Sequence, residues 1–166
     1  MITVPTETYR ILKNKKKLEK ELNVKLKFKG KKATIDGAEL QEFITGRVIE
    51  ALNLGFQLQS ALALKDEDFI FEKINIKNLT KRHDLARVRA RLIGQNGRTK
   101  KTLQELSGCA VCIKDNKVGI IGHFDCIRAA TNAVTNLIHG SKQSSVYAFL
   151  EKERAKLREE DLGLKE

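Results

Sequence analysis

The sequence has no tryptophan, a single proline and few aromatic residues, which make up 5% of its 166 residues. Sheets of the RRM type stack RNA bases on aromatic side chains, so this composition argues against that class. No apolar run approaches the roughly 20 residues that span a bilayer, and polar Thr6, Glu7 and Thr8 stand where a signal peptide would be apolar. The three cysteines are typical of free thiols in a reducing compartment. We therefore expect a cytoplasmic protein that does not bind membranes.

Positive charge, in contrast, is in excess and unevenly spread. Lys and Arg outnumber Asp and Glu by 32 to 21, a net charge of +11. Residues 1–35 carry a net +8 and residues 77–101 again +8, whereas residues 36–76 carry −5 and residues 102–166 are neutral. Such basic blocks indicate a polyanionic partner, and nucleic acid is the one that the rest of the sequence favours.

An internal repeat relates the two halves at an offset of 85 residues. Residues 23–37 (NVKLKFKGKKATIDG) align without gaps with residues 108–122 (GCAVCIKDNKVGIIG). The pairs Lys29/Lys114, Lys32/Lys117, Ile35/Ile120, Gly37/Gly122 and Gly55/Gly140 match in this alignment. Each copy has the pattern of a β-hairpin followed by a helix, which indicates a duplicated unit.

The second copy shows the clearest element order. Alternating apolar residues at 69–76 predict a strand, and residues 81–93 and 98–107 have helical spacing. Short apolar runs at 109–114 and 117–121 flank the turn dipeptide Asp115-Asn116, and a helix is expected from Phe124 to His139, capped by Gly140. The resulting order, β-α-α-β-β-α with Gly94-Gln95-Asn96-Gly97 between the helices, is the type I KH arrangement.

The Gly94–Gly97 loop is the predicted RNA-binding element. Glycine permits positive φ and close approach of a ligand to the backbone. The N-terminus of the following helix presents free N–H groups and a positive dipole, both suited to a phosphate. Because Gln95 and Asn96 are uncharged, positive charge must come from flanking residues. The predicted RNA-binding residues are Gly94, Gln95, Asn96, Gly97, Arg98, Lys100, Lys101, Arg87 and Arg91, with Ile93, Val111 and Ile113, beside Leu92 and Leu103, as candidate aliphatic contacts to bases.

The first copy lacks this loop. Five residues separate Leu12 from Leu18, where nine separate Ile93 from Leu103. The missing four are the length of the glycine loop, and Lys13, Lys15, Lys16 and Lys17 stand there instead. We interpret this copy as a degenerate unit that serves as scaffold, electrostatic support or protein-docking face.

With 41% hydrophobic residues the chain can bury a core. We predict an α+β protein of two tandem type I KH domains, the first degenerate, followed by a C-terminal helix. The predicted boundaries are 1–68 for the first domain with a linker helix, 69–140 for the second domain, and 141–166 for the helix and tail. In that tail, Val146, Phe149, Leu150 and Leu157 lie on one side of a highly charged helix, which we expect to pack on the preceding domain.

Three segments together resemble the archaeal members of the Dim-two family, also called partner-of-Nob. They are the loop with its flanking helices at 85–108, the linker at 51–68, and the tail segment SVYAFLEKERAKL at 145–157. The resemblance implies a ribosome biogenesis factor that binds the 3′ region of small-subunit ribosomal RNA as single strand through the second KH domain. It also implies two protein partners, the endonuclease that matures that 3′ end and the alpha subunit of initiation factor two. The uncharged Gln95-Asn96 pair departs from the lysine common in such loops.

Cys109 and Cys112 form a C-x-x-C pair, the one pattern that suggests chemistry. Residues three apart on a strand point to opposite faces, and no second pair or His-x-x-x-His follows at zinc-site spacing. His83, His123 and His139 have no nucleophile at a spacing typical of hydrolases, and no P-loop is present. We therefore expect no enzymatic activity, no metal and no cofactor, and a packing role for the cysteines.

Three alternatives remain open on the sequence. The acidic stretch 36–76 fits an adaptor that docks a translation initiation factor subunit. The KH pattern also fits a general messenger-binding or exosome-type protein, and the C-x-x-C pair fits a thiol enzyme.

Overall fold

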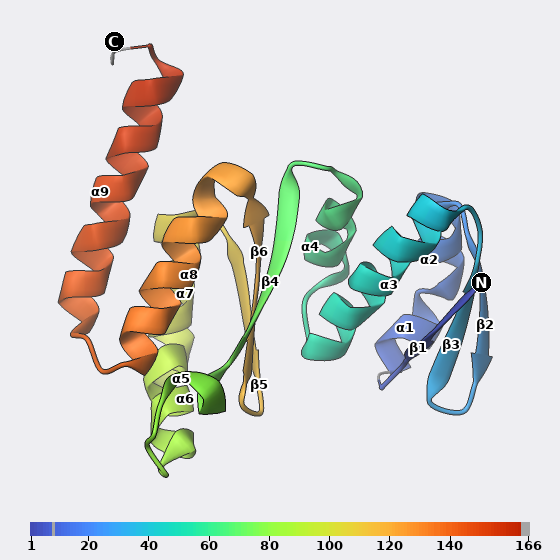
Figure 1. Cartoon of the computed structure of the whole chain (residues 1–166), viewed down its shortest axis with the longest axis horizontal. Coiled ribbons are helices and arrows are strands. Elements are labelled where there is room, and N and C mark those ends of the chain that lie inside the picture. Colours follow the sequence, from blue (N-terminus) through green and yellow to red (C-terminus); the bar gives the residue numbers. More distant parts are fainter. Residues whose placement is uncertain (8, 164–166) are drawn as a thin grey trace. The chain divides into compact units, whose positions relative to one another are not determined.

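The computed structural model describes residues 1–7 and 9–163. The chain forms two compact units, Met1–Phe71 and a second that begins at Glu72, and each is described by itself (Figure 1). None of the helices in the described residues combines the length and apolar content that crossing a membrane requires.

The first unit packs helices on a three-stranded sheet. Its strands β1 (Ile2–Pro5), β3 (Lys32–Asp36) and β2 (Lys25–Lys29) lie in the order β1-β3-β2, and both pairs are antiparallel. The helices are α1 (Tyr9–Lys13), α2 (Lys15–Leu22), α3 (Glu39–Leu54) and α4 (Leu58–Leu62), with a 3₁₀ turn at Ala63–Lys65. Alternation along β2 directs Leu26 into the core while its lysines remain exposed. The largest fully buried side chains of this unit are Ile11, Leu18, Leu26, Ile35, Ile49 and Leu52.

The second unit contains the helix–loop–helix element. Its strands β4 (Phe69–Asn75), β6 (Lys117–His123) and β5 (Ala110–Lys114) lie in the order β4-β6-β5. Helices α6 (Leu85–Ile93) and α7 (Arg98–Ser107) flank a 3₁₀ turn at Gln95–Gly97, and α8 (Phe124–Ile138) and α9 (Gln143–Asp161) follow. The fully buried side chains are Ile76, Leu92, Leu103, Ile120, Leu137 and Ile138.

Most elements expected in residues 69–139 are confirmed, with two differences. The helix expected from residue 81 begins at Leu85. A short helix, α5 (Ile76–Leu79), precedes it, and the Asn75 side chain accepts a hydrogen bond from Lys77 N at 3.1 Å, as a helix N-cap does. The local capping chemistry therefore ends β4 and leaves residues 80–84 irregular.

The repeat is confirmed in three dimensions. Strands β5 and β6 and helix α8 each begin 85 residues after β2, β3 and α3. Left-handed backbone recurs at the same offset, since φ is positive at Asn23, Gly30 and Gly55 and again at Gly108, Asp115 and Gly140.

Side-chain contacts repeat as well. The Glu19 carboxylate accepts the Leu26 N–H at 2.8 Å, and 85 residues later Gln104 Oε1 accepts the Val111 N–H at 3.0 Å. Both units thus tie their second helix to the first strand of the hairpin by the same hydrogen bond.

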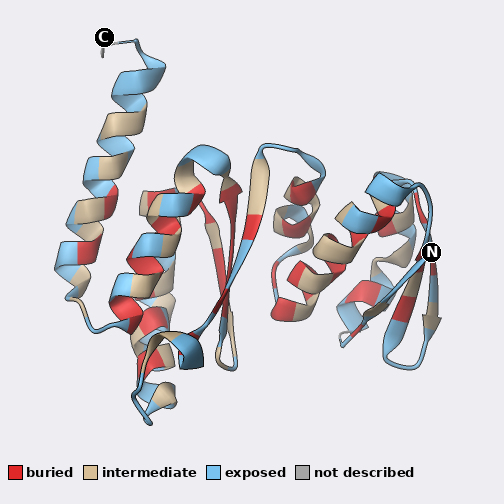
Figure 2. Cartoon of the chain, in the orientation of Figure 1, coloured by how far each residue is buried: buried red, intermediate tan, exposed pale blue. Residues whose placement is uncertain are grey.

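The C-terminal helix α9 packs on α7 and α8, as predicted. Its buried residues are Val146 and Leu150, four apart on one face, while Phe149 and Leu157 are half-buried. Exposure increases toward Asp161 along the helix (Figure 2).

Candidate nucleic-acid interface

The Gly94–Gly97 loop is a tight turn with left-handed backbone. Gly94, Asn96 and Gly97 have φ values of 77°, 54° and 74°, and Gly97 N donates to Gly94 O at 3.2 Å. Such φ values favour glycine, and asparagine is among the few other residues that adopt them readily. The residue types in the loop are therefore those that its conformation requires.

The two glycines are required for different reasons. A Cβ at Gly94 would lie 2.2 Å from Thr99 Oγ1 and 2.6 Å from Thr99 N, so the first position is sterically closed. A Cβ at Gly97 would meet nothing within 4 Å. Gly94 thus lets the chain turn back against α7, whereas Gly97 leaves open space at the start of that helix for a ligand to approach the backbone.

Thr99 connects the loop to the C-terminal helix. Its side chain is buried beneath Gly94, and Gln143 Nε2 lies 3.0 Å from Thr99 Oγ1. Gln143 is the first residue of α9, so the docking of that helix supports the loop from the inside. Sequence reasoning missed both residues; the position of Thr99 five residues after the first glycine is the signal that points to the contact.

Of the cations beside the loop, Arg98 is the most available. It is exposed at the first turn of α7 and has no ion-pair partner among residues 1–7 and 9–163. Lys101 lies 3.9 Å from Glu105, one turn along α7, and Lys100 is half-buried. Arg87 is 83% exposed with only a long contact, 3.9 Å, to Asp84.

Arg91 is held by the protein itself. Its guanidinium donates to Leu137 O at 3.0 Å and to Ser141 O. Both carbonyls belong to the connection between α8 and α9, whose terminal C=O groups have no helical partners. The sequence pattern groups Arg91 with Arg87, four residues away on α6, but the hydrogen bonds give it a structural role.

The aliphatic candidates divide by exposure. Ile93 is 37% exposed and Ile113 is half-buried, whereas Val111 is only 3% exposed and offers a base little surface. Leu92 and Leu103 are fully buried. Strand alternation fits several of these residues equally well, so only burial separates core from contact surface.

The corresponding place in the first unit has no loop. Helices α1 and α2 are separated by one residue, Asn14, whose φ of −99° is right-handed. The Asn14 side chain donates to Arg10 O at 2.8 Å, back along α1. This junction therefore offers neither positive φ nor glycine, although Lys13, Lys16 and Lys17 are exposed around it.

The C-x-x-C pair has no chemistry to perform at neutral pH. Burial raises the pKa of the Cys109 thiol to about 12, with the nearby Cys126 a smaller contribution in the same direction. Cys109 Sγ packs against Gly122, where an added Cβ would meet it at 2.2 Å, just as the Val24 side chain packs against Gly37 in the first unit. Within the described chain, no three His, Cys, Asp or Glu side chains form a group that could hold a metal ion.

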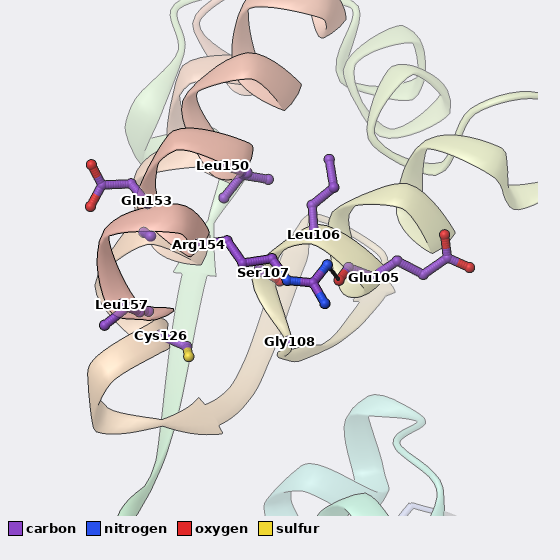
Figure 3. Close-up of a pocket in the computed structure, with 10 residues that line it drawn as sticks. Glu105, Leu106, Ser107, Gly108, Cys126, Leu150, Glu153, Arg154 and Leu157 are labelled. Carbon is purple, nitrogen blue, oxygen red and sulfur yellow. Dashed lines mark hydrogen bonds between the residues drawn. The ribbon is translucent and has the colours of Figure 1, made fainter. Parts of the chain in front are cut away.

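A cavity near the C-terminal helix is also unsuited to catalysis. It measures about 130 Å³ and lies among α7, α8 and α9, with Leu106, Leu150 and Leu157 on its walls (Figure 3). The Arg154 side chain reaches toward the end of α7, where it is 3.5 Å from Glu105 O (Figure 3). Small-molecule sites usually measure about 300 Å³ or more, so this gap is a packing defect beneath α9.

Known proteins share this architecture. The family model of the second KH domain of PNO1, described as a eukaryotic-type KH domain (type I), matches residues 70–155. A KH domain-containing protein of Methanocaldococcus jannaschii is 30% identical over 151 residues, 87% of this chain and 66% of that protein. The pre-rRNA-processing protein PNO1 of Debaryomyces hansenii is 33% identical over 161 residues, 93% of this chain and 62% of that protein. The chain thus spans slightly less than two thirds of these relatives.

A solved structure agrees over nearly the whole chain. The complex of a/eIF2alpha, aDim2p and rRNA from Pyrococcus horikoshii contains a chain with a TM-score of 0.83 and 28% identity, which covers 93% of this chain and 94% of that one. The similarity includes both units and the loop.

Proposed function

The chain belongs to the PNO1/Dim2 family of KH-domain proteins, and we propose that it is a ribosome biogenesis factor that binds single-stranded RNA at the Gly94–Gly97 loop. The observation that carries the proposal is the asymmetry of the two glycines. The first is closed by Thr99, and the second opens the start of α7 to solvent. A phosphate seated there would meet backbone N–H groups, the positive end of the α7 dipole and Arg98.

In this proposal the RNA backbone contacts Gly97 and the first turn of α7, and Gln95 and Asn96 contribute amide hydrogen bonds. Arg87, Arg98, Lys100 and Lys101 supply charge. A base packs on Ile93, with Ile113 beside it, whereas Val111 and Arg91 act through the core and the α8–α9 connection. The KH class takes unstacked strand, about four nucleotides at a loop of this kind.

The RNA is proposed to be the 3′ region of small-subunit ribosomal RNA, whose processing the protein would assist. The relative from Debaryomyces hansenii is called a pre-rRNA-processing protein, and the Pyrococcus horikoshii structure is described as a complex with rRNA. The maturation endonuclease is proposed as a protein partner on the family resemblance alone.

The repeat supports a tandem arrangement. We propose that residues 1–68 form a degenerate type I KH domain, that 69–140 form the RNA-binding KH domain, and that 141–166 form a helix and tail. The shared hairpin geometry at an offset of 85 supports the common origin, and the right-handed junction at Asn14 supports the loss of the loop.

Replacing Gln95 and Asn96 together by aspartate tests the site. Two carboxylates at the loop would repel the phosphate, and we expect affinity for a small-subunit 3′-end oligonucleotide to fall by more than tenfold. The matched control is Gln57→Asp with Asn78→Asp, which adds the same charge at exposed positions away from the loop. Equal binding by the loop variant, the control and the unmodified protein would exclude the loop as the RNA site.

One observation favours an adaptor role as the second candidate. The Pyrococcus horikoshii complex also contains a/eIF2alpha. If docking of that subunit is the main function, capture of the purified subunit will survive complete ribonuclease treatment and the Gln95→Asp/Asn96→Asp change. Loss of capture on ribonuclease treatment would instead make RNA the bridge between the two proteins.

A further inference from the structure

The outer face of the β1-β3-β2 sheet carries a row of lysines. Along β2, Leu26 is buried and Phe28 half-buried, whereas Lys25, Lys27 and Lys29 are exposed on the opposite face (Figure 2). In the antiparallel register, Lys29 is paired with Lys32 of β3, which adds a fourth exposed cation to the same face.

These lysines do not stabilise the sheet. Like charges directly opposite one another on a sheet face are destabilising, and Lys29 and Lys32 form such a pair. Thr34 lies opposite Lys27, and the single acidic residue in the β2–β3 register is Asp36, opposite Lys25. No ion pair engages any of these four lysines in the part of the chain that the structure describes.

The second unit provides an internal comparison. At an offset of 85, Lys25 and Lys27 correspond to Ala110 and Cys112 of β5, which has the same length and the same pairing with its neighbour. Thr34 corresponds to Gly119. The fold therefore forms this hairpin without lysine at the first two positions, so Lys25 and Lys27 require an explanation other than folding.

Their spacing matches an extended polyanion. Alternate residues on one strand are about 6.8 Å apart, which is close to the separation of successive phosphates in an extended nucleic-acid strand. The Thr3 and Thr34 hydroxyl oxygens lie 3.4 Å apart on the neighbouring strands of this face and can donate hydrogen bonds to phosphate oxygens. The row is thus a line of cations and hydroxyls without base-stacking groups.

We propose that the outer face of the β1-β3-β2 sheet is a second, sequence-independent RNA surface that binds the phosphate backbone through Lys25, Lys27, Lys29 and Lys32. It is separate from the Gly94–Gly97 loop and from the lysines between α1 and α2. The inference rests on the proposed RNA-binding function, and it assigns to this face the RNA that extends beyond the nucleotides held at the loop.

The test compares two RNAs and two charge-matched variants. A short oligonucleotide of small-subunit 3′-end sequence fills the loop, and a long RNA contains the same sequence with single-stranded extensions on both sides. Lys25→Gln/Lys27→Gln removes two charges from the sheet face, and Lys152→Gln/Arg158→Gln removes two exposed charges from α9. Affinity is measured by fluorescence anisotropy across a salt series.

We expect the sheet variant to bind the short RNA normally and the long RNA several-fold more weakly. The slope of log affinity against log salt for the long RNA should fall by about 1.4, because each phosphate contact with a single strand contributes about 0.7. The α9 variant should retain both the affinity and the slope. The melting temperature of the sheet variant should be unchanged or higher, since lysines that oppose folding have been removed.

Three outcomes would overturn the inference. Equal losses in the sheet and α9 variants would mean that only net charge matters. A loss for the short RNA would make the face part of the loop site. Loss of binding to anionic lipid vesicles, with both RNAs unaffected, would identify a membrane surface instead. If the unmodified protein fails to bind the short RNA but binds the long one, the loop proposal fails while the sheet variant still decides the second surface.

Discussion

Thr99 lies so close to Gly94 that a methyl group at position 94 would stand 2.2 Å from its hydroxyl oxygen. The residue that shapes the loop thus comes from the helix that follows it. The same threonine is hydrogen-bonded by Gln143, so the loop depends on α9, which begins about fifty residues later in the chain.

The first prediction separates the two glycines. Gly97→Ala should cost about 1–2 kcal/mol, because the methyl group fits but a left-handed backbone is strained for alanine. Gly94→Ala should cost about 1–3 kcal/mol more, because the methyl also overlaps Thr99. Urea denaturation of both variants measures the difference, and equal stabilities would show that the contact with Thr99 does not restrict the loop.

The second prediction concerns Gln143. Gln143→Ala should destabilise the protein by about 1 kcal/mol or more, since it leaves the buried Thr99 hydroxyl without this partner. Thr99→Val combined with Gln143→Ala should cost less than the sum of the two single changes. A double-mutant cycle in urea measures the coupling, and strict additivity would contradict the hydrogen bond.

The third prediction distinguishes Arg91 from Arg98. Arg91→Gln should lower stability by about 1–3 kcal/mol, because two main-chain carbonyls at the α8–α9 connection lose their donor. Arg98→Gln should leave stability nearly unchanged and weaken RNA binding, with a salt slope lower by about 0.7. The reverse pattern, with normal stability and weak binding in the Arg91 variant, would restore Arg91 to the RNA surface.

The fourth prediction uses the buried thiol. The pKa of Cys109 is raised from 9.0 to about 12 in the folded protein, so the thiol stays protonated where the unfolded chain ionises. Because the folded pKa is the higher one, its contribution to stability is fully present below pH 9 and is lost as pH rises toward 12. Cys109→Val should remove this part of the alkaline loss, since valine fills the equivalent place at Val24. An unchanged pH profile of stability in that variant would contradict the assignment.

The elements of the second unit could be predicted because local patterns specify them. The alternation at 69–76 and the turn at Asp115-Asn116 each give one answer, and β4, β5 and β6 follow. The start of α6 could not be predicted, since residues 80–84 have helix-compatible side chains and only the capping by Asn75 and the turn at α5 interrupt them.

The candidate site was predictable in its backbone and less so in its side chains. The order of residues indicates the loop, because glycine spacing and the flanking helices are local properties. Whether Arg91 or Val111 faces solvent depends on α9 and on the sheet, which are distant in sequence. The pairing of Lys29 with Lys32, and with it the row of lysines, appears only once the strand register is known.

The most direct test of the account is an NMR titration of the ¹⁵N-labelled protein with a single-stranded oligonucleotide of the small-subunit rRNA 3′ end. The account predicts that the largest amide shifts fall on Gly97, Arg98 and the next residues of α7, with smaller ones at Ile93 and Ile113. Shifts confined to other parts of the chain, with the amides of Gly94–Lys101 unmoved at saturation, would contradict it.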